Sequence, residues 1–245
     1  MSTLQSSGGA RPRLLVRQGL TLLWDVIVSP SQAGQALDVM GSLTFLLPLC
    51  LVWLLHVAFQ FVIQSPAEAI LVDQMRLHMG DSQLNATLEY LRSSRQIGLF
   101  LTPLFILLKW VAVAFLMYLV LVLIDELFSF GTLVSLVGFA SLFSALADLE
   151  VLLILYIRGF DSLHKLTDLQ PSIGLGLLCS SKRGFAYSFA EHFSVFELWG
   201  IAFLSVAIYA LLRRKSAFRA LMPAAGVWLS VALVHSAFVA LLPSS

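Results

Sequence analysis

Charged side chains are scarce in this sequence. Only 12% of its 245 residues are Asp, Glu, Lys or Arg, against roughly 25% in soluble domains. The 15 basic and 14 acidic residues leave a formal net charge of +1, which gives no electrostatic reason to expect a nucleic-acid partner. This composition excludes an ordinary soluble domain.

Cysteines and familiar catalytic motifs are also scarce. Neither of the two cysteines, Cys50 and Cys179, occupies a position that requires a disulfide. The chain has no Gly-x-Ser-x-Gly elbow for a serine nucleophile. It also has no His-Glu-x-x-His pair for zinc and no glycine-rich phosphate loop. We therefore expect a protein that is not an enzyme and that uses no cofactor and no metal.

Long apolar runs are abundant instead. Hydrophobic residues make up 59% of the chain, and its mean hydropathy is +0.90. About 20 apolar residues cross a bilayer as a helix, and these runs are continuous rather than alternating as in barrel strands. They predict an all-α fold, a polytopic membrane bundle with five transmembrane helices. The spans are expected at about 39–63, 102–124, 131–157, 194–212 and 220–242.

The segments outside these spans are more polar. Residues 1–13 predict a disordered tail, and 14–245 form one membrane domain. In residues 14–40, charged and apolar side chains alternate as in a helix that lies in the membrane interface, with Pro30 breaking it. Residues 64–100 are expected to be a polar connection with short helices.

The third span, residues 131–157, is rich in small residues at helical spacing. Such residues let helices approach closely in lipid, which favours a central position in the bundle. The pairs are Gly131 with Ser135, Ala140 with Ser144, and Ser141 with Ala145. This face can pack against the chain's own spans or dock a partner protein.

Five spans place the termini on opposite sides, and basic residues decide the orientation. The densest basic turn contains Arg213, Arg214, Lys215 and Arg219. It predicts a cytoplasmic N-terminus and an external C-terminus. The same turn can hold anionic lipid headgroups, at about 1 kcal/mol per charge, or serve only to fix the orientation.

With this orientation, six ionisable side chains fall in the outer half of the spans. They are His56, Lys109, Asp148, Glu150, Glu197 and His235. Ionisable residues inside a membrane are functional candidates, so this polar layer can bind a lipid headgroup, a peptide or protons. In the alternative interpretation, Lys109 pairs with Asp148 or Glu150, and the histidines are hydrogen-bonded between helices. Since Asp148 and Glu150 are about 200° apart around a helix, at most one is expected to be the key acid.

Several blocks resemble the YIP family, the Ypt/Rab-interacting-protein-like five-pass membrane proteins. Residues 24–30 resemble the family's tryptophan-to-proline entry, and residues 129–142 resemble the block that opens its third span. Residues 193–200 resemble its aromatic-then-tryptophan block before the fourth span, and the basic turn at 213–219 also fits. The resemblance covers about residues 20–245.

The resemblance implies five spans with the N-terminus inside and the C-terminus outside. The short N-terminal segment and the long connection at 64–100 resemble the bacterial branch, which places the protein in the cytoplasmic (inner) membrane. Some bacterial members accompany ABC-type exporters, whereas a Rab-type GTPase partner is implied only if the eukaryotic branch applies. We therefore expect an accessory or scaffold subunit for membrane transport or envelope organisation. The alternative is a small carrier, or a lipid- or ligand-binding protein that uses the polar layer.

Overall fold

The protein is an all-α bundle in the computed structural model. The structure describes residues 21–40, 42–76, 79–126, 128–169, 171, 174–179, 184–212 and 216–241, and no β-strand occurs among them. Residues 21–28 are helical. The α-helices that follow are α2 (Pro30–Met40), α3 (Leu46–Arg76), α4 (Asp81–Leu123), α5 (Phe130–Arg158), α6 (Phe185–Glu191), α7 (Val195–Leu211) and α8 (Ala217–Leu241). Short 3-10 helices are η1 (Ser42–Phe45), η2 (Phe160–Ser162), η3 (Leu166–Leu169) and η4 (Gly174–Leu178).

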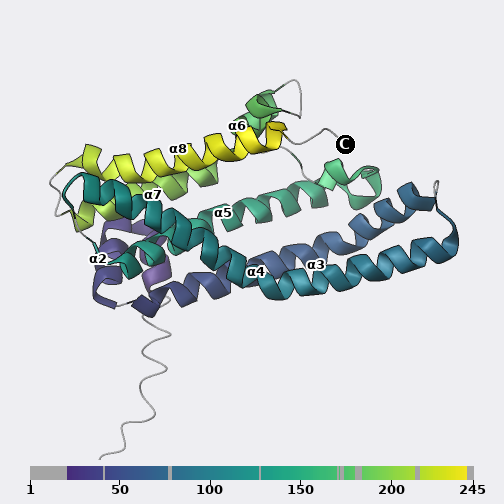
Figure 1. The fold of residues 1–245 in the computed structure, drawn as a ribbon, viewed down its shortest axis with the longest axis horizontal. Coiled ribbons are helices and arrows are strands. Elements are labelled where there is room, and N and C mark those ends of the chain that lie inside the picture. Colours follow the sequence, from purple (N-terminus) through teal and green to yellow (C-terminus); the bar gives the residue numbers. More distant parts are fainter. Residues whose placement is uncertain are drawn as a thin grey trace, which may run out of the picture.

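Among the described residues, four helices are long and apolar enough to cross a membrane. They are α3, α4, α5 and α8, and α6 with α7 forms a fifth candidate span that is bent by 59°. These helices run roughly along one direction in Figure 1, with α5 between the α3–α4 pair and the α7–α8 pair. The prediction of an α-helical membrane bundle is confirmed.

Helices α3 and α4 extend far beyond the predicted spans. The expectation of a polar connection with short helices at residues 64–100 is therefore wrong, because most of these residues belong to the two long helices. At 1.5 Å per residue the 43 residues of α4 measure about 65 Å, whereas the hydrocarbon core is about 30 Å thick. The polar half of α4, which begins at Asp81, extends with the end of α3 beyond the other helices of the bundle (Figure 1). Arg92 Nη2 donates to Glu68 Oε2 at 2.9 Å, and Arg95 Nη2 donates to the Gln60 carbonyl oxygen at 2.7 Å. These bonds join the two helices of the projecting hairpin.

Helix α5 is the centre of the bundle, as its small residues predict. It contacts α3, α4 and α7, and most residues from Thr132 to Ala140 are buried. A Cβ atom added at Gly138 would lie 2.8 Å from Cζ3 of Trp110. The glycine thus allows the indole of α4 to pack directly on the α5 backbone.

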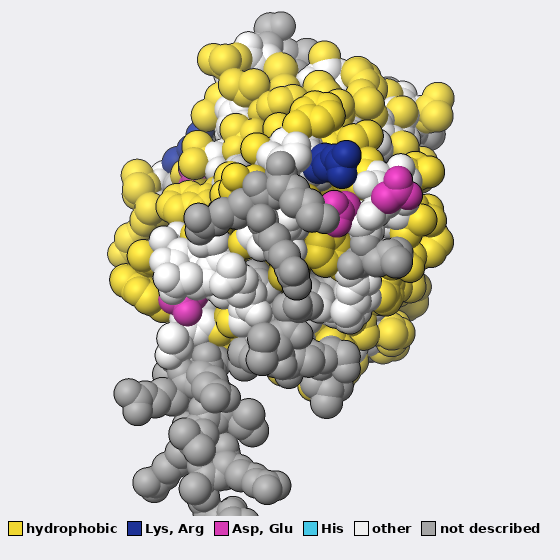
Figure 2. Space-filling view, turned by 90° about the vertical axis from the view of Figure 1, so that its left-hand side faces the viewer, with side chains coloured by type: hydrophobic (Ala, Val, Ile, Leu, Met, Phe, Trp, Pro, Cys, Tyr) yellow, Lys and Arg dark blue, Asp and Glu magenta, His cyan; other side chains and the backbone are white. Residues whose placement is uncertain are grey.

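The opposite end of the bundle from the hairpin tip holds the N-terminal helices and two interhelical turns. Pro30 begins α2, as predicted, and the backbone N–H groups of Gln32 and Ala33 donate to the Ser29 carbonyl oxygen. Leu22 and Leu37 are buried in the same core as α5 and α7. Figure 2 faces this end and shows the few described charged side chains as isolated patches among hydrophobic ones. The N-terminal helices are therefore packed into the bundle, and their position at the membrane interface stays a prediction.

The closest approach of α2 to α7 predicts a sensitive position. A Cβ atom at Gly34 would lie 2.9 Å from the carbonyl oxygen and 3.0 Å from Cα of Ala207. Because both atoms are backbone, the helices must separate, and we expect Gly34→Ala to destabilise the protein by about 1–3 kcal/mol. Unfolding of the purified protein in detergent measures this change. The control Gly226→Ala, where a Cβ meets nothing within 4 Å, should be neutral or slightly stabilising, and equal losses in the two variants would refute tight α2–α7 packing.

Candidate functional site: a cavity with a polar mouth

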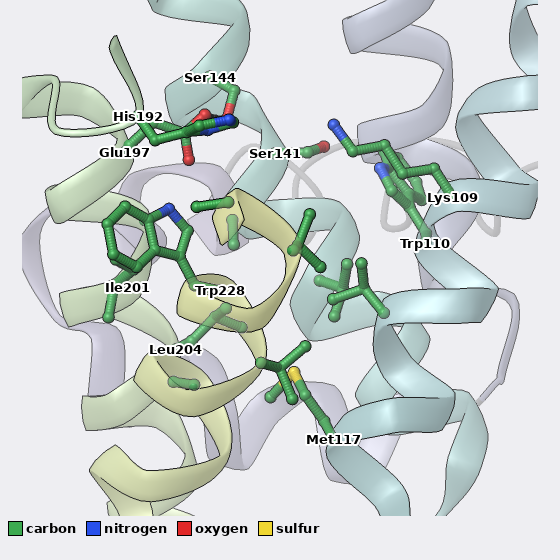
Figure 3. Close-up of a pocket in the computed structure, with 18 residues that line it drawn as sticks. Lys109, Trp110, Met117, Ser141, Ser144, His192, Glu197, Ile201, Leu204 and Trp228 are labelled. Carbon is green, nitrogen blue, oxygen red and sulfur yellow. Dashed lines mark hydrogen bonds between the residues drawn. The ribbon is translucent and has the colours of Figure 1, made fainter. Parts of the chain in front are cut away.

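A cavity of about 140 Å³ lies between helices α4, α5, α7 and α8. Its deep part is lined by apolar side chains, including Met117, Leu204 and Val227. Its polar side chains gather at the end nearer α6, which is called the mouth here (Figure 3). They are Lys109, Ser141, Ser144, His192 and Glu197.

Glu197 supplies the negative charge of the mouth. It stands in the first turn of α7, and its backbone N–H donates to Oγ of Ser194, the N-cap residue, at 3.1 Å. The Ser-x-x-Glu spacing is that of a capping box, in which the glutamate turns back to the N-cap. Here the carboxylate instead accepts a hydrogen bond from Ser144 Oγ of α5 at 3.0 Å. The interaction between helices directs the acid into the cavity mouth.

Lys109 supplies the positive charge from the opposite wall. It precedes the buried Trp110 on α4, and Figure 3 shows its ammonium group near Ser141, away from Glu197. Within the described part of the chain Lys109 forms no ion pair, neither with Glu197 nor with Asp148 or Glu150. The predicted pairing of Lys109 with an acid of the third span is therefore not found among these residues. Two opposite charges face one cavity without neutralising each other.

A pair of histidines borders the mouth. Nε2 of His192 lies 3.1 Å from Nδ1 of His235 on α8, and the rings meet edge to face. His192 follows the last residue of α6, so it stands at the 59° bend before α7. Sequence analysis missed His192 because the residue lies outside the predicted spans. The aromatic series of Phe185, Phe189 and Phe193, spaced by four, is the signal that indicates a helix there.

The predicted polar layer divides into two groups and a separate residue, Glu150. Lys109 and Glu197 line the cavity, and His235 joins them through His192. Asp148 is half-buried on α5 and is close enough to His56 of α3 for an electrostatic interaction. Glu150 is half-buried and does not line the cavity. The six residues are thus not one continuous layer.

The predicted lipid-contacting turn is described only in part. Arg213, Arg214 and Lys215 lie outside the described residues. Nη1 of Arg219 lies 3.7 Å from Oε1 of Glu126. This ion pair joins the start of α8 to the turn after α4, so Arg219 has a structural contact of its own.

An apolar groove runs along the outside of the bundle between α4 and α8. Its walls include Leu116, Val234 and Phe238, and His235 also borders it. Val231 lines both this groove and the internal cavity. Val231 is therefore the partition between the cavity and the surface that faces lipid.

Trp228 leaves a polar atom unsatisfied at the cavity. Its Nε1 is buried and has no hydrogen-bond partner among the described residues. Figure 3 shows this nitrogen on the side of the mouth. A buried unpaired donor costs about 1–3 kcal/mol.

The fold and the cavity define an α-helical membrane protein with an internal amphiphilic site. Comparisons of the chain with protein-family models, with curated proteins and with solved structures give no match. No three His, Cys, Asp or Glu side chains converge as metal ligands in the described ranges. The two histidines of the predicted polar layer, His56 and His235, interact with Asp148 and His192 respectively.

The lack of an ion pair at Lys109 in the described chain predicts how its substitution affects stability. Because it has no ion pair in the described chain, we expect Lys109→Met to change the free energy of unfolding by less than about 0.5 kcal/mol. Its neighbour Trp110 is 2% exposed, and Trp110→Ala should cost about 3–5 kcal/mol. Thermal unfolding in detergent compares the two variants. A large loss for Lys109→Met would instead reveal a stabilising ion pair.

Proposed function

We propose that the protein binds an amphiphilic lipid, with the headgroup at the mouth of the cavity and an acyl chain against its apolar walls. The observation that carries this proposal is the placement of Lys109 and Glu197, unpaired, at one end of an otherwise apolar cavity. Lys109 is exposed and Glu197 is half-buried, and neither has an ion-pair partner in the described chain, so both charges are available to a ligand. A headgroup supplies the missing partners, and its chain fills the apolar part.

The size of the cavity supports a particular way of binding. At about 140 Å³ it is similar to an engineered cavity of about 150 Å³ that takes one benzene. It therefore holds a headgroup or a short chain segment, not a whole phospholipid. The groove of Leu116, Val234 and Phe238, which shares Val231 with the cavity, offers the rest of the chain an apolar path along α8.

Closing the partition tests this proposal. A Val231→Trp variant puts a large side chain between cavity and groove, so we expect retained phospholipid to fall about tenfold, the loss of about 1.4 kcal/mol of binding. The full chain is purified in mild detergent from vesicles of mixed phosphatidylethanolamine and phosphatidylglycerol, and bound lipid is counted by native mass spectrometry.

Leu233→Trp is the matched control. Leu233 is an exposed residue of α8 that lines neither the cavity nor the groove. This variant should retain lipid like the unchanged protein. If Val231→Trp also retains it fully, the cavity is not the lipid site.

We propose a second candidate function, an accessory or scaffold subunit for membrane transport, because of the projecting α3–α4 hairpin. Tyr90 on this hairpin is 72% exposed, and the hairpin extends well past the thickness of a bilayer. This proposal includes four further points. The protein is a member of the YIP family, is not an enzyme, has a cytoplasmic N-terminus and resides in the bacterial inner membrane. Support for it comes from where the family-like blocks fall: at the start of α2, at the start of α5 and at the bend between α6 and α7.

A photo-crosslinking amino acid at position 90 tests the scaffold function. We expect crosslinking in native membranes to give one discrete protein adduct, in which the partner is a subunit of an ABC-type exporter. Position 123 is the control, because Leu123 is equally exposed but lies at the opposite end of α4. The same adducts from both positions, or none from position 90, would exclude the hairpin as a docking arm.

A further inference from the structure

We infer that the lipid headgroup held at the cavity mouth is a zwitterion, with a phosphate and a primary ammonium, as in phosphatidylethanolamine. This inference rests on the lipid-binding function proposed above and specifies the ligand. It is carried by the signs and positions of the groups around the mouth.

The two charges of the mouth stand on opposite walls. Lys109 comes from α4 and Glu197 from α7, and Ser141 and Ser144 of α5 lie between them (Figure 3). The Lys109 ammonium nitrogen is not within 4.0 Å, the limit for a salt bridge, of a carboxylate oxygen of Glu197. Lys109 is exposed and Glu197 is half-buried. A ligand with a single charge pairs with one wall and leaves the charge on the other wall without an opposite charge. A zwitterion satisfies both.

The hydrogen-bonding groups assign one end of the headgroup to each wall. Lys109 is a donor only, and a phosphate accepts from it. Ser144 already occupies Oε1 of Glu197, so Oε2 is the carboxylate atom that remains for a ligand. A primary ammonium donates to that oxygen, whereas a trimethylammonium group has no N–H to give.

Competition among headgroups tests the inference. The full chain in dodecyl maltoside is mixed with equal amounts of phosphatidylethanolamine, phosphatidylcholine and phosphatidylglycerol of identical acyl chains, and bound species are counted by native mass spectrometry. We expect phosphatidylethanolamine to exceed each of the others by about tenfold, the effect of one hydrogen bond to a charged group. Soluble phosphoethanolamine shares the headgroup chemistry but has no acyl chain, so it should not displace the bound phosphatidylethanolamine.

Three variants locate the preference. Glu197→Gln should abolish discrimination against phosphatidylglycerol, because Lys109 alone still attracts a phosphate, and Lys109→Met should weaken binding of all three phospholipids. Exchanging the charges, Lys109→Glu with Glu197→Lys, keeps one charge of each sign at the mouth and should restore part of the preference. Arg92→Met removes a charge from the projecting hairpin and is the control. It should leave the amounts of the three bound lipids unchanged.

The possible outcomes separate the two proposals. If the unchanged protein retains none of the three lipids, the proposed lipid-binding function is wrong. If it retains phosphatidylglycerol or phosphatidylcholine in amounts equal to phosphatidylethanolamine, lipid binding stands and the primary-ammonium zwitterion is wrong. Displacement by soluble phosphoethanolamine at the same concentration would identify a small polar ligand instead of a lipid.

Discussion

Close approach of helix backbones through small residues is the constraint on which this bundle depends. Lipid tails are as apolar as the side chains, so helices in a bilayer associate by packing and not by exclusion of water. At Gly138 there is no room for a methyl group beside Trp110, and a Cβ at Gly200 would lie 3.3 Å from the Ala140 carbonyl oxygen. Helix α5 is thereby held between α4 and α7, and these contacts fix the walls of the cavity.

The cavity lies beside the packed stretch of α5. Val137 and Ala140 in this stretch line its apolar part, and Ser141 and Ser144, which follow them on the helix, line its polar mouth. The bend between α6 and α7 occurs at the same level, since His192 and Glu197 lie on its two sides and both line the mouth. The interrupted helix therefore supplies both the room and the polar groups. This arrangement is typical of sites in membrane proteins, where irregular backbone is tolerated around a polar cavity.

The sequence predicted the helices that need only local information. Uninterrupted apolar runs mark α4, α5 and α8, and the small residues of α5 indicate its central place. The α3–α4 hairpin was missed because its polar residues resemble a loop, whereas an interaction between Glu68 and Arg92, 24 positions apart, joins its helices. The polar layer was predicted only in part for a related reason. Helical periodicity gives the direction of a side chain on its own helix but not the neighbour it meets. The sequence therefore could not show that Lys109 lines the cavity while Asp148 lies near His56.

The separation of Lys109 from Glu197 is the feature that favours a binding site over a purely structural polar layer. A direct ion pair would neutralise both charges and stabilise the empty protein, and both side chains border the same cavity. Instead, Ser144 holds the Glu197 carboxylate on its own wall, and Lys109 remains unpaired in the described chain. Because Lys109 is exposed and Glu197 is half-buried, keeping the two charges apart costs the bundle little. Both therefore remain available to opposite charges on the ligand that is proposed to enter the cavity.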